Sequence, residues 1–338
     1  MRKKINKKTY YILLALVTGI VIYSTVMVVY SLIPIDQKKA TVIVDIPTGS
    51  SFLQITKILN DAGIIRSRIL FYGLASSRLA WLSIRAGEYE FNTSMSPSEV
   101  LSKLLRGEIK IYPVTIPEDV SVKEIAEILM KYKLIDEEQF FELAEDEEFL
   151  ESLNIQAASI EGYLFPDTYF LDRSMSTRLI MRKMVEQFWK KVTPAMRDRA
   201  NKLGFTMHQY VTLASIIGKE SGKTDEKNLI SAVFHNRLKK KMRLQSDPTA
   251  VYDLLNFTGA VLRSHLKRNS PYNTYIINGL PPGPIANPGL DSLNAALYPA
   301  DKNYLYFVSR RDGSHFFSSS LETHNQAVSR YRSNKNKN

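Results

Sequence analysis

The stretch MHQYVTLASIIGKESGKTDEKNLISAVFHNRLKKKMRLQSDP, residues 207–248, is the segment around which the C-terminal half of the chain is organised. Four of its residues follow one another at spacings of 3, 4 and 3 and so share one face of an α-helix: Tyr210, Leu213, Ile217 and Glu220. A carboxyl group held among apolar side chains has a raised pKa, as a general acid needs near neutral pH. The alternative is a helix end, because Ser221-Gly222 is a typical stop signal and Glu220 then simply faces water.

The rest of this stretch predicts a second helix and the start of a third. An apolar stripe over residues 225–241 indicates a core-facing helix with Asn236 and Arg237 at one edge. In Ser246-Asp247-Pro248 a capping side chain precedes a proline suited to the first turn, which predicts a helix start. Asp247 is therefore expected either to cap this helix or to face the same site as Glu220.

Three further segments are typical of loops or turns around a cleft. SPYNTY (270–275) and GLPPGPIANPG (279–289) are too rich in turn residues for regular structure. EGYLFPDTYF (161–170) carries four aromatic rings, which either stack on sugar rings or plug the core. Asp312-Gly313 indicates a hairpin between two apolar segments.

Composition excludes several classes of protein. The formal net charge is +11, but nine basic residues lie near the two ends and the rest of the chain carries only +2, which is not the footprint of a nucleic-acid binder. There is no cysteine, so disulfides, thiolate metal sites and a cysteine nucleophile are excluded. The histidines show no H-x-x-x-H spacing, and no G-x-S-x-G occurs, which disfavours a metallohydrolase and a serine hydrolase.

The N-terminal region predicts a membrane span. Residues 9–35 contain no charged side chain, and residues 10–33 read YYILLALVTGIVIYSTVMVVYSLI, long enough to cross a bilayer and longer than a signal-peptide core. Five positive charges precede the span, whereas Lys38 and Lys39 after it are offset by Asp36. The positive-inside rule therefore predicts a cytoplasmic N-terminus, with the remaining chain outside the plasma (inner) membrane.

An internal repeat follows the span. IPTGSSFLQITKILNDAGII (46–65) matches IPEDVSVKEIAEILMKYKLI (116–135) without a gap. Each copy predicts a strand, a polar turn and a helix, and a further strand (86–91) and a helix with Ser96 as N-cap lie between them. This pair of β/α modules is either a spacer above the membrane or a glycan-binding region.

Seven segments, in this order behind one span, resemble the YceG-like family of MltG-type endolytic murein transglycosylases: LASIIGKESG, FHNRL, MRLQSDPT, YNTY, NGLPPGPIANPG, SLNAAL and YLYFVS. The resemblance implies an α+β fold with LysM-like membrane-proximal modules and an α+β lytic transglycosylase domain. It also implies that Glu220 is the catalytic acid. Many members carry a further glutamate two residues earlier, where this chain has Gly218, so Glu220 is the only acid left in the motif. The implied domains are a cytoplasmic N-terminus (1–8), a transmembrane helix (9–35), a LysM-like module (40–110), a second repeat-related module (111–155), a catalytic domain (156–330) and a basic tail (331–338).

The implied reaction needs one carboxyl group. Glu220 is expected to protonate the glycosidic oxygen after N-acetylmuramic acid, after which its carboxylate takes a proton from the C6 hydroxyl of the same sugar and a 1,6-anhydro ring closes. No water is consumed, and no metal or other cofactor is predicted. Polar and aromatic side chains around the acid are expected to bind the sugar: Tyr163, Asn236, Arg237, Gln245, Asp247, Tyr272, Asn273, Thr274 and Tyr275.

Two alternatives and a set of partners remain open at this level. A glycoside hydrolase would need a second carboxylate, for which Asp247 and Glu161 are candidates. A non-catalytic cell-wall binding or scaffold protein is the other alternative. The resemblance and the membrane span imply peptidoglycan strands as substrate, with penicillin-binding proteins and the division or elongation machinery as partners.

Overall fold

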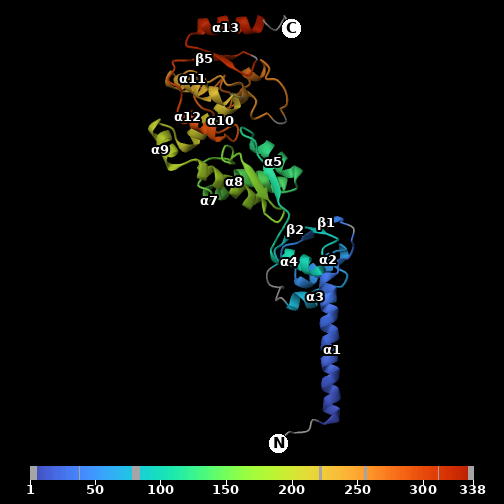
Figure 1. Ribbon diagram of the computed structural model, residues 1–338. Coiled ribbons are helices and arrows are strands. Elements are labelled where there is room, and N and C mark those ends of the chain that lie inside the picture. Colours follow the sequence, from blue (N-terminus) through green and yellow to red (C-terminus); the bar gives the residue numbers. More distant parts are fainter. Residues whose placement is uncertain are drawn as a thin grey trace. The chain divides into compact units, whose positions relative to one another are not determined.

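The computed structural model describes residues 6–37, 39–77, 84–220, 223–254, 257–310 and 312–333. The chain forms two compact units, Met1–Tyr112 with Leu171–Met175 and Pro113–Phe170 with Ser176–Asn338. Within the described ranges, helices are combined with two-stranded sheets of short strands (Figure 1). This confirms the predicted mixed α+β class. The predicted second module (111–155) lies mostly in the same unit as the predicted catalytic region.

The first unit contains a long helix and a small β/α body. Its elements are α1 (Lys7–Leu32), β1 (Thr41–Ile46), α2 (Phe52–Asp61), α3 (Arg68–Ser77), β2 (Gly87–Asn92) and α4 (Pro97–Leu105). β1 and β2 pair antiparallel, with Val44 opposite Tyr89. Both of these side chains are buried in a core that the three shorter helices complete.

The second unit is mainly helical. Its elements are β3 (Tyr112–Thr115), α5 (Val122–Lys131), α6 (Glu137–Glu145), α7 (Glu147–Ser152), β4 (Thr168–Leu171), α8 (Thr177–Lys191), α9 (Pro194–Lys202), α10 (Met207–Glu220), η2 (Thr224–Glu226), α11 (Lys227–Lys239), η3 (Asp247–Ala250), η4 (His265–Lys267), α12 (Leu290–Leu297), β5 (Tyr306–Ser309), β6 (His315–Ser318) and α13 (Leu321–Ser333), where η denotes a short 3₁₀ helix. β3 pairs with β4, and β5 and β6 form the predicted hairpin. α10 packs against α12 and also contacts α9, α11 and η3.

The two sequence repeats begin their helices in the same way. Ser51 caps α2 and Ser121 caps α5, each accepting a hydrogen bond from the backbone N–H three residues later. The side chains at those positions, Gln54 and Glu124, accept the cap backbone N–H in return at 2.7 Å. Such reciprocal capping satisfies two donors that a helix start leaves free. The first copy then continues through α3 to β2, and the second through α6 and α7 to β4, each of which pairs with the first strand of its own copy. The likeness of the two copies to LysM stays a prediction.

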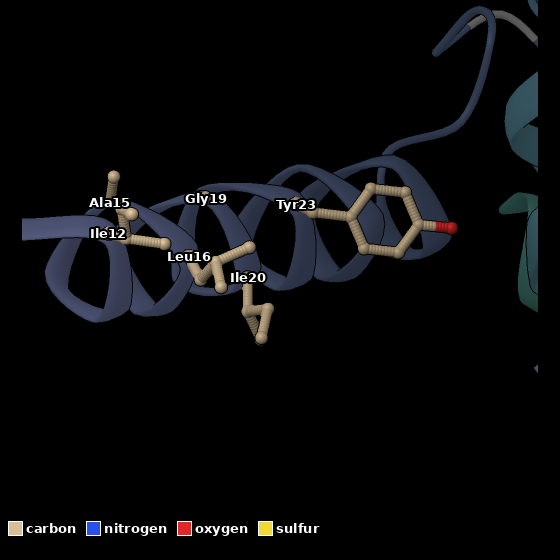
Figure 2. A pocket seen from close by; sticks show the side chains of 6 residues that line it. All are labelled: Ile12, Ala15, Leu16, Gly19, Ile20 and Tyr23. Atoms are coloured by element: carbon tan, nitrogen blue, oxygen red, sulfur yellow. The ribbon is translucent and has the colours of Figure 1, made fainter. Parts of the chain in front are cut away.

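α1 is the one helix of the described chain that is long and apolar enough to cross a membrane. Its side chains from Ile12 to Tyr23 line a shallow apolar groove along the helix surface (Figure 2). None of the residues of α1 is fully buried. The predicted apolar N-terminal helix is therefore confirmed, whereas its insertion and orientation stay predictions.

Candidate active site

Glu220 is the last residue of α10, and its carboxyl group bonds to a neighbouring segment of the same unit. The residues predicted to share its face, Tyr210, Leu213 and Ile217, are completely buried. Glu220 itself is partly exposed. The helix ends at Glu220, as the second expectation has it, but the carboxyl group bonds to Ser246 and does not simply face water. The predicted stop signal Ser221-Gly222 lies outside the described residues.

Two donors from a different segment hold the Glu220 carboxyl group. Ser246 Oγ donates a hydrogen bond of 2.5 Å to Glu220 Oε1, and the backbone N–H of Asp247 also donates to this carboxyl. Burial raises the pKa of Glu220 to about 7; the hydrogen bonds oppose this rise, and the negative charge of Asp247 adds to it. A carboxyl group with this pKa can both give and accept a proton near neutral pH.

The segment that carries Ser246 runs past Glu220 with alternating burial. Leu244 and Ser246 are buried, whereas Gln245 and Asp247 are exposed. Gln245 has a φ of 50°, in the left-handed region that few side-chain-bearing residues adopt. The alternation directs the serine to the acid and leaves the amide and the carboxylate available to a ligand.

Thr274 holds this segment in place through hydrogen bonds. It is completely buried, and its Oγ1 accepts a hydrogen bond of 2.9 Å from the Ser246 backbone N–H. The Gln245 N–H donates to the Thr274 carbonyl oxygen at 3.1 Å, and Thr249 Oγ1 lies 2.7 Å from Thr274 Oγ1. Thr274, predicted to contact the sugar, instead positions the serine that bonds the acid.

Tyr275 and Asp247 form a pair on the exposed side. The Tyr275 hydroxyl donates a hydrogen bond of 2.5 Å to Asp247 Oδ1, and the ring is partly exposed. The prediction that Asp247 caps a helix is wrong, because the N-cap of η3 is Ser246 and no side-chain capping bond forms. The physical reason is that Asp247 is itself the first residue of η3 and its carboxylate accepts the hydrogen bond from Tyr275.

Arg237 is a buried residue near Glu220 and not an exposed one. Only 6% of its surface is exposed. Its Nε donates to the Leu305 carbonyl at 2.7 Å, and its Nη1 donates to the Leu244 carbonyl at 2.6 Å. Burial lowers the pKa of Arg237, and Glu220 is among the groups whose charge opposes this. Arg237 thus supports the segment beside the acid and places a positive charge near it.

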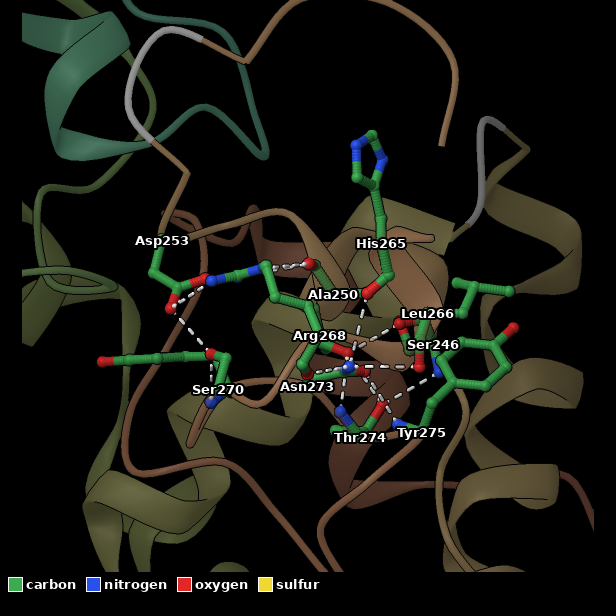
Figure 3. Close-up of polar contacts among 12 residues, drawn as sticks. Ser246, Ala250, Asp253, His265, Leu266, Arg268, Ser270, Asn273, Thr274 and Tyr275 are labelled. Atoms are coloured by element: carbon green, nitrogen blue, oxygen red, sulfur yellow. Dashed lines mark hydrogen bonds and ion pairs between the residues drawn. The ribbon is translucent and has the colours of Figure 1, made fainter. Parts of the chain in front are cut away.

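Asn236 and Asn273 are occupied by backbone contacts. Asn236 Nδ2 donates to the carbonyl oxygens of Lys302 and Tyr304 at 2.8 and 2.9 Å. Asn273 is completely buried, and its Nδ2 donates to the Arg268 carbonyl at 2.7 Å (Figure 3). The amide nitrogens of both residues therefore shape loops around the site.

Tyr163 and Tyr272, the remaining predicted sugar-binding residues, lie against other aromatic groups. Tyr163 is 1% exposed and packs against Phe188 and Trp189, so its ring has no free face for a sugar. Tyr272 is partly exposed, with its ring centroid 4.7 Å from that of Tyr252. The expected stacking role does not fit Tyr163, which serves the core.

Glu161 is a second carboxyl group with a raised pKa, but it has almost no exposed surface. It is 5% exposed and accepts hydrogen bonds from the Val122 N–H at 3.1 Å, Asn287 Nδ2 at 2.9 Å and the Tyr252 hydroxyl at 3.0 Å. Burial raises its pKa to about 7, and the hydrogen bonds from Val122 and Tyr252 oppose this. A role as the second carboxylate of a hydrolase does not fit this burial.

Asn287 is a structural centre that the sequence pattern did not single out. It is completely buried. Its Oδ1 accepts the backbone N–H of Gly162 at 3.0 Å and of Leu164 at 2.9 Å. Its Nδ2 donates to the Val120 carbonyl at 3.0 Å as well as to Glu161. Asn287 thereby joins the proline-rich loop, the aromatic loop and the second repeat.

Gly218 leaves room for the carboxyl group of Asp119, a residue of the second repeat. A Cβ atom at position 218 would overlap Asp119 Oδ1. Asp119 has a φ of 62°, and its Oδ1 is buried without a hydrogen-bond partner among the described residues. Burial raises the pKa of Asp119 to about 6. The absence of a side chain at 218 is therefore a steric requirement of this chain.

Across the described ranges, no group of three or more His, Asp or Glu side chains is arranged to hold a metal ion. Five of the predicted sugar-binding residues lie around Glu220 and fall into two sets. Gln245, Asp247 and Tyr275 expose surface beside Glu220, whereas Arg237 and Thr274 hold the site together from within.

Known proteins resemble this chain along most of its length. The sequence profile of the YceG-like family matches residues 44–330. A Bacillus subtilis (strain 168) protein named endolytic murein transglycosylase is 33% identical over 320 residues, which cover 90% of this chain and 88% of that protein. A protein of the same name from Streptococcus pneumoniae serotype 2 is 29% identical over 90% of this chain, which spans 61% of that protein. A crystal structure of a yceG-like protein from Listeria monocytogenes has a TM-score of 0.59 and 33% identity, covering 86% of this chain and 100% of that one. The chain therefore belongs to the YceG-like family.

Proposed function

We propose that this protein is a membrane-anchored endolytic lytic transglycosylase of peptidoglycan, with Glu220 as its general acid and base. The observation that carries the proposal is Glu220, a partly exposed residue at the end of α10 whose carboxyl group is held by Ser246 and has a pKa raised by burial to about 7. Family membership and the names of the relatives support the reaction class.

In the proposed mechanism Glu220 acts twice. Its protonated form gives a proton to the oxygen of the bond between N-acetylmuramic acid and N-acetylglucosamine as that bond breaks. The carboxylate then accepts the proton of the C6 hydroxyl, whose oxygen bonds to C1 and closes a 1,6-anhydromuramoyl end. Positive charge that develops on the ring is met by nearby polar groups, for which Asp247, Gln245 and the Tyr275 hydroxyl are the exposed candidates.

The decisive experiment digests un-crosslinked glycan strands with the wild-type protein and with Glu220→Gln, followed by mass analysis. We expect 1,6-anhydro ends from the wild type and a loss of about 100-fold or more in rate for the variant. The matched control is Glu161→Gln, the same change at a buried glutamate whose pKa is also near 7, which should leave cleavage intact. Persistent cleavage by Glu220→Gln would refute the assignment.

A hydrolase is the second candidate, because the exposed carboxylate of Asp247 lies beside Glu220. A hydrolase leaves reducing ends, which are heavier than anhydro ends by one water. Asp247→Asn separates the two reactions further. A hydrolase that uses Asp247 loses its activity, whereas the transglycosylase keeps most of it.

The cellular setting belongs to the same proposal. α1 would anchor the protein in the plasma membrane with its N-terminus in the cytoplasm and the chain that follows α1 outside, in keeping with the charge distribution around the span. The repeat modules would act as LysM-like glycan-binding or spacing elements. Penicillin-binding proteins and the division or elongation machinery are the proposed partners, and a nucleic acid is not among them.

A further inference from the structure

α3 lies along the C-terminal half of α1 (Figure 1). The Tyr30 hydroxyl donates a hydrogen bond of 3.0 Å to the Ser67 carbonyl, just before α3 begins. Further along α3, a Cβ atom at Gly73 would lie 3.1 Å from the Tyr23 hydroxyl and 3.3 Å from Met27 Cε. α3 therefore runs back along α1 from Tyr30 towards Tyr23.

The length of α1 places this contact at the depth of the membrane. The uncharged residues 9–22, which precede the contact, rise only about 21 Å as a helix. A hydrocarbon core of about 30 Å needs about twenty residues, so a span that begins at Thr9 extends to about Val28. Tyr23 and Met27, and with them the Gly73 region of α3, then fall within the outer leaflet.

The outward side of α3 has the composition of a helix at a membrane interface. Ile69 is 84% exposed and Tyr72 is 44% exposed, and Arg68 is exposed beside them. An apolar ring with a hydroxyl group suits the boundary between acyl chains and headgroups, and a cation suits the lipid phosphates. If this side of α3 faced water, most of the apolar surface of Ile69 would be exposed to it.

A groove between the two helices has matching chemistry. Its volume is about 330 Å³, and its lining includes the apolar side chains of Val26, Val29, Ile33 and Leu70 together with Arg66. Apolar walls that include one guanidinium group fit an acyl chain with its phosphate. Thr25 and Val26, which line the groove from α1, lie within the part of the helix that the proposed anchor places in lipid.

We propose that the exposed face of α3, formed by Arg68, Ile69 and Tyr72, binds the phospholipids of the outer leaflet, so that the first unit rests on the membrane and is not merely tethered to it. This inference rests on the proposed membrane anchor. α3 packs on α1 and is not free to move away, so the two helices enter the bilayer as one body.

The test uses the full-length protein in phospholipid nanodiscs and exploits the absence of native cysteine. Single variants Ile69→Cys and Tyr72→Cys carry a fluorescent label, which is quenched either by lipids with a nitroxide near the headgroup or by aqueous iodide. The solvent control is Ile43→Cys on β1, 48% exposed in the same unit. The bilayer control is Val17→Cys on α1.

We expect lipid nitroxides to quench the labels at 69 and 72 several-fold more strongly than the label at 43, and iodide to show the reverse order. Labels at 69 and 72 that behave like the label at 43, while the label at 17 is buried in lipid, would overturn this inference and leave the anchor intact. A label at 17 that iodide reaches would overturn both the anchor and the inference. Protection of 69 and 72 from both quenchers would overturn the lipid assignment in favour of a protein partner.

Discussion

Ser246 and Asp247 act on Glu220 with opposite sign, which gives the proposed acid a testable pH signature. A general acid works in its protonated form, so cleavage should fall as pH rises through the Glu220 pKa of about 7. Ser246 Oγ donates to the carboxylate and lowers that pKa. Ser246→Ala should therefore move the alkaline limb of kcat/KM to higher pH by about one unit, the size of a hydrogen bond to a charged group.

Asp247→Asn should move the same limb the other way. The negative charge of Asp247 raises the Glu220 pKa, and asparagine removes the charge while keeping the backbone N–H that donates to Glu220. The limb should therefore shift to lower pH. The two profiles are compared on one soluble glycan substrate. Shifts of both variants in the same direction would mean that another group controls the profile.

Gly218 and Asp119 should be coupled in stability. A methyl group at 218 overlaps Asp119 Oδ1, so Gly218→Ala should lower the free energy of unfolding by about 2 kcal/mol, as overpacked sites do. Asp119→Gly removes the obstructing carboxyl group and also suits the φ of 62°. The double variant should recover most of the loss in a denaturant-based double-mutant cycle. Simple additivity of the two changes would contradict the steric explanation.

The contacts of these residues explain what sequence reasoning could and could not find. The spacing of apolar residues along α10 correctly predicts an inward Glu220, because periodicity depends only on neighbours in one helix. The bond from Ser246 joins segments 26 residues apart, and no local pattern encodes it. The sequence context of Asp247 favours a cap, but the helix begins one residue earlier than this requires, and the Asp247 carboxylate accepts a hydrogen bond from Tyr275, 28 residues away.

Between elements, Glu161 ties the start of α5 to the aromatic loop and the proline-rich loop, and it should make stability depend on pH. Its folded pKa of about 7 lies above the ordinary value of 4.5, so the folded state holds a proton that the unfolded state has lost between these values. Stability from this group is present below about pH 4.5 and is lost as pH rises to about 7.

Glu161→Gln should remove this dependence. Its oxygen can accept from Val122 and Asn287, while its amide can donate to the Tyr252 hydroxyl, so the contacts survive. Between pH 4.5 and 8 the wild type should lose about 3 kcal/mol relative to the variant, measured by denaturant unfolding. A constant difference across this range would show that Glu161 keeps the same charge when the chain folds.

For the molecule as a whole, composition and periodicity predict the apolar N-terminal helix and the repeated strand–helix start, and the family resemblance predicts the mixed α+β class. The sequence patterns did not predict that most of the second repeat shares a compact unit with the residues around Glu220. That union depends on Asn287, whose four side-chain hydrogen bonds each cross more than one hundred residues of sequence. A sequence pattern that covers a single helix cannot predict contacts of this kind.

The division into two units predicts that residues 113–338 suffice for cleavage. Glu220, Ser246, Asp247 and Tyr275 all belong to the second unit, as do Glu161 and Asn287, which brace it. A chain of residues 113–338 should therefore fold cooperatively and cleave soluble glycan strands within about tenfold of the full-length rate, because a unit with its own core can fold alone. Thermal unfolding and product masses measure the two properties, with Glu220→Gln in the same truncated chain as control. A folded but inactive product would show that the first unit takes part in substrate binding, and the first repeat module would then be more than a spacer.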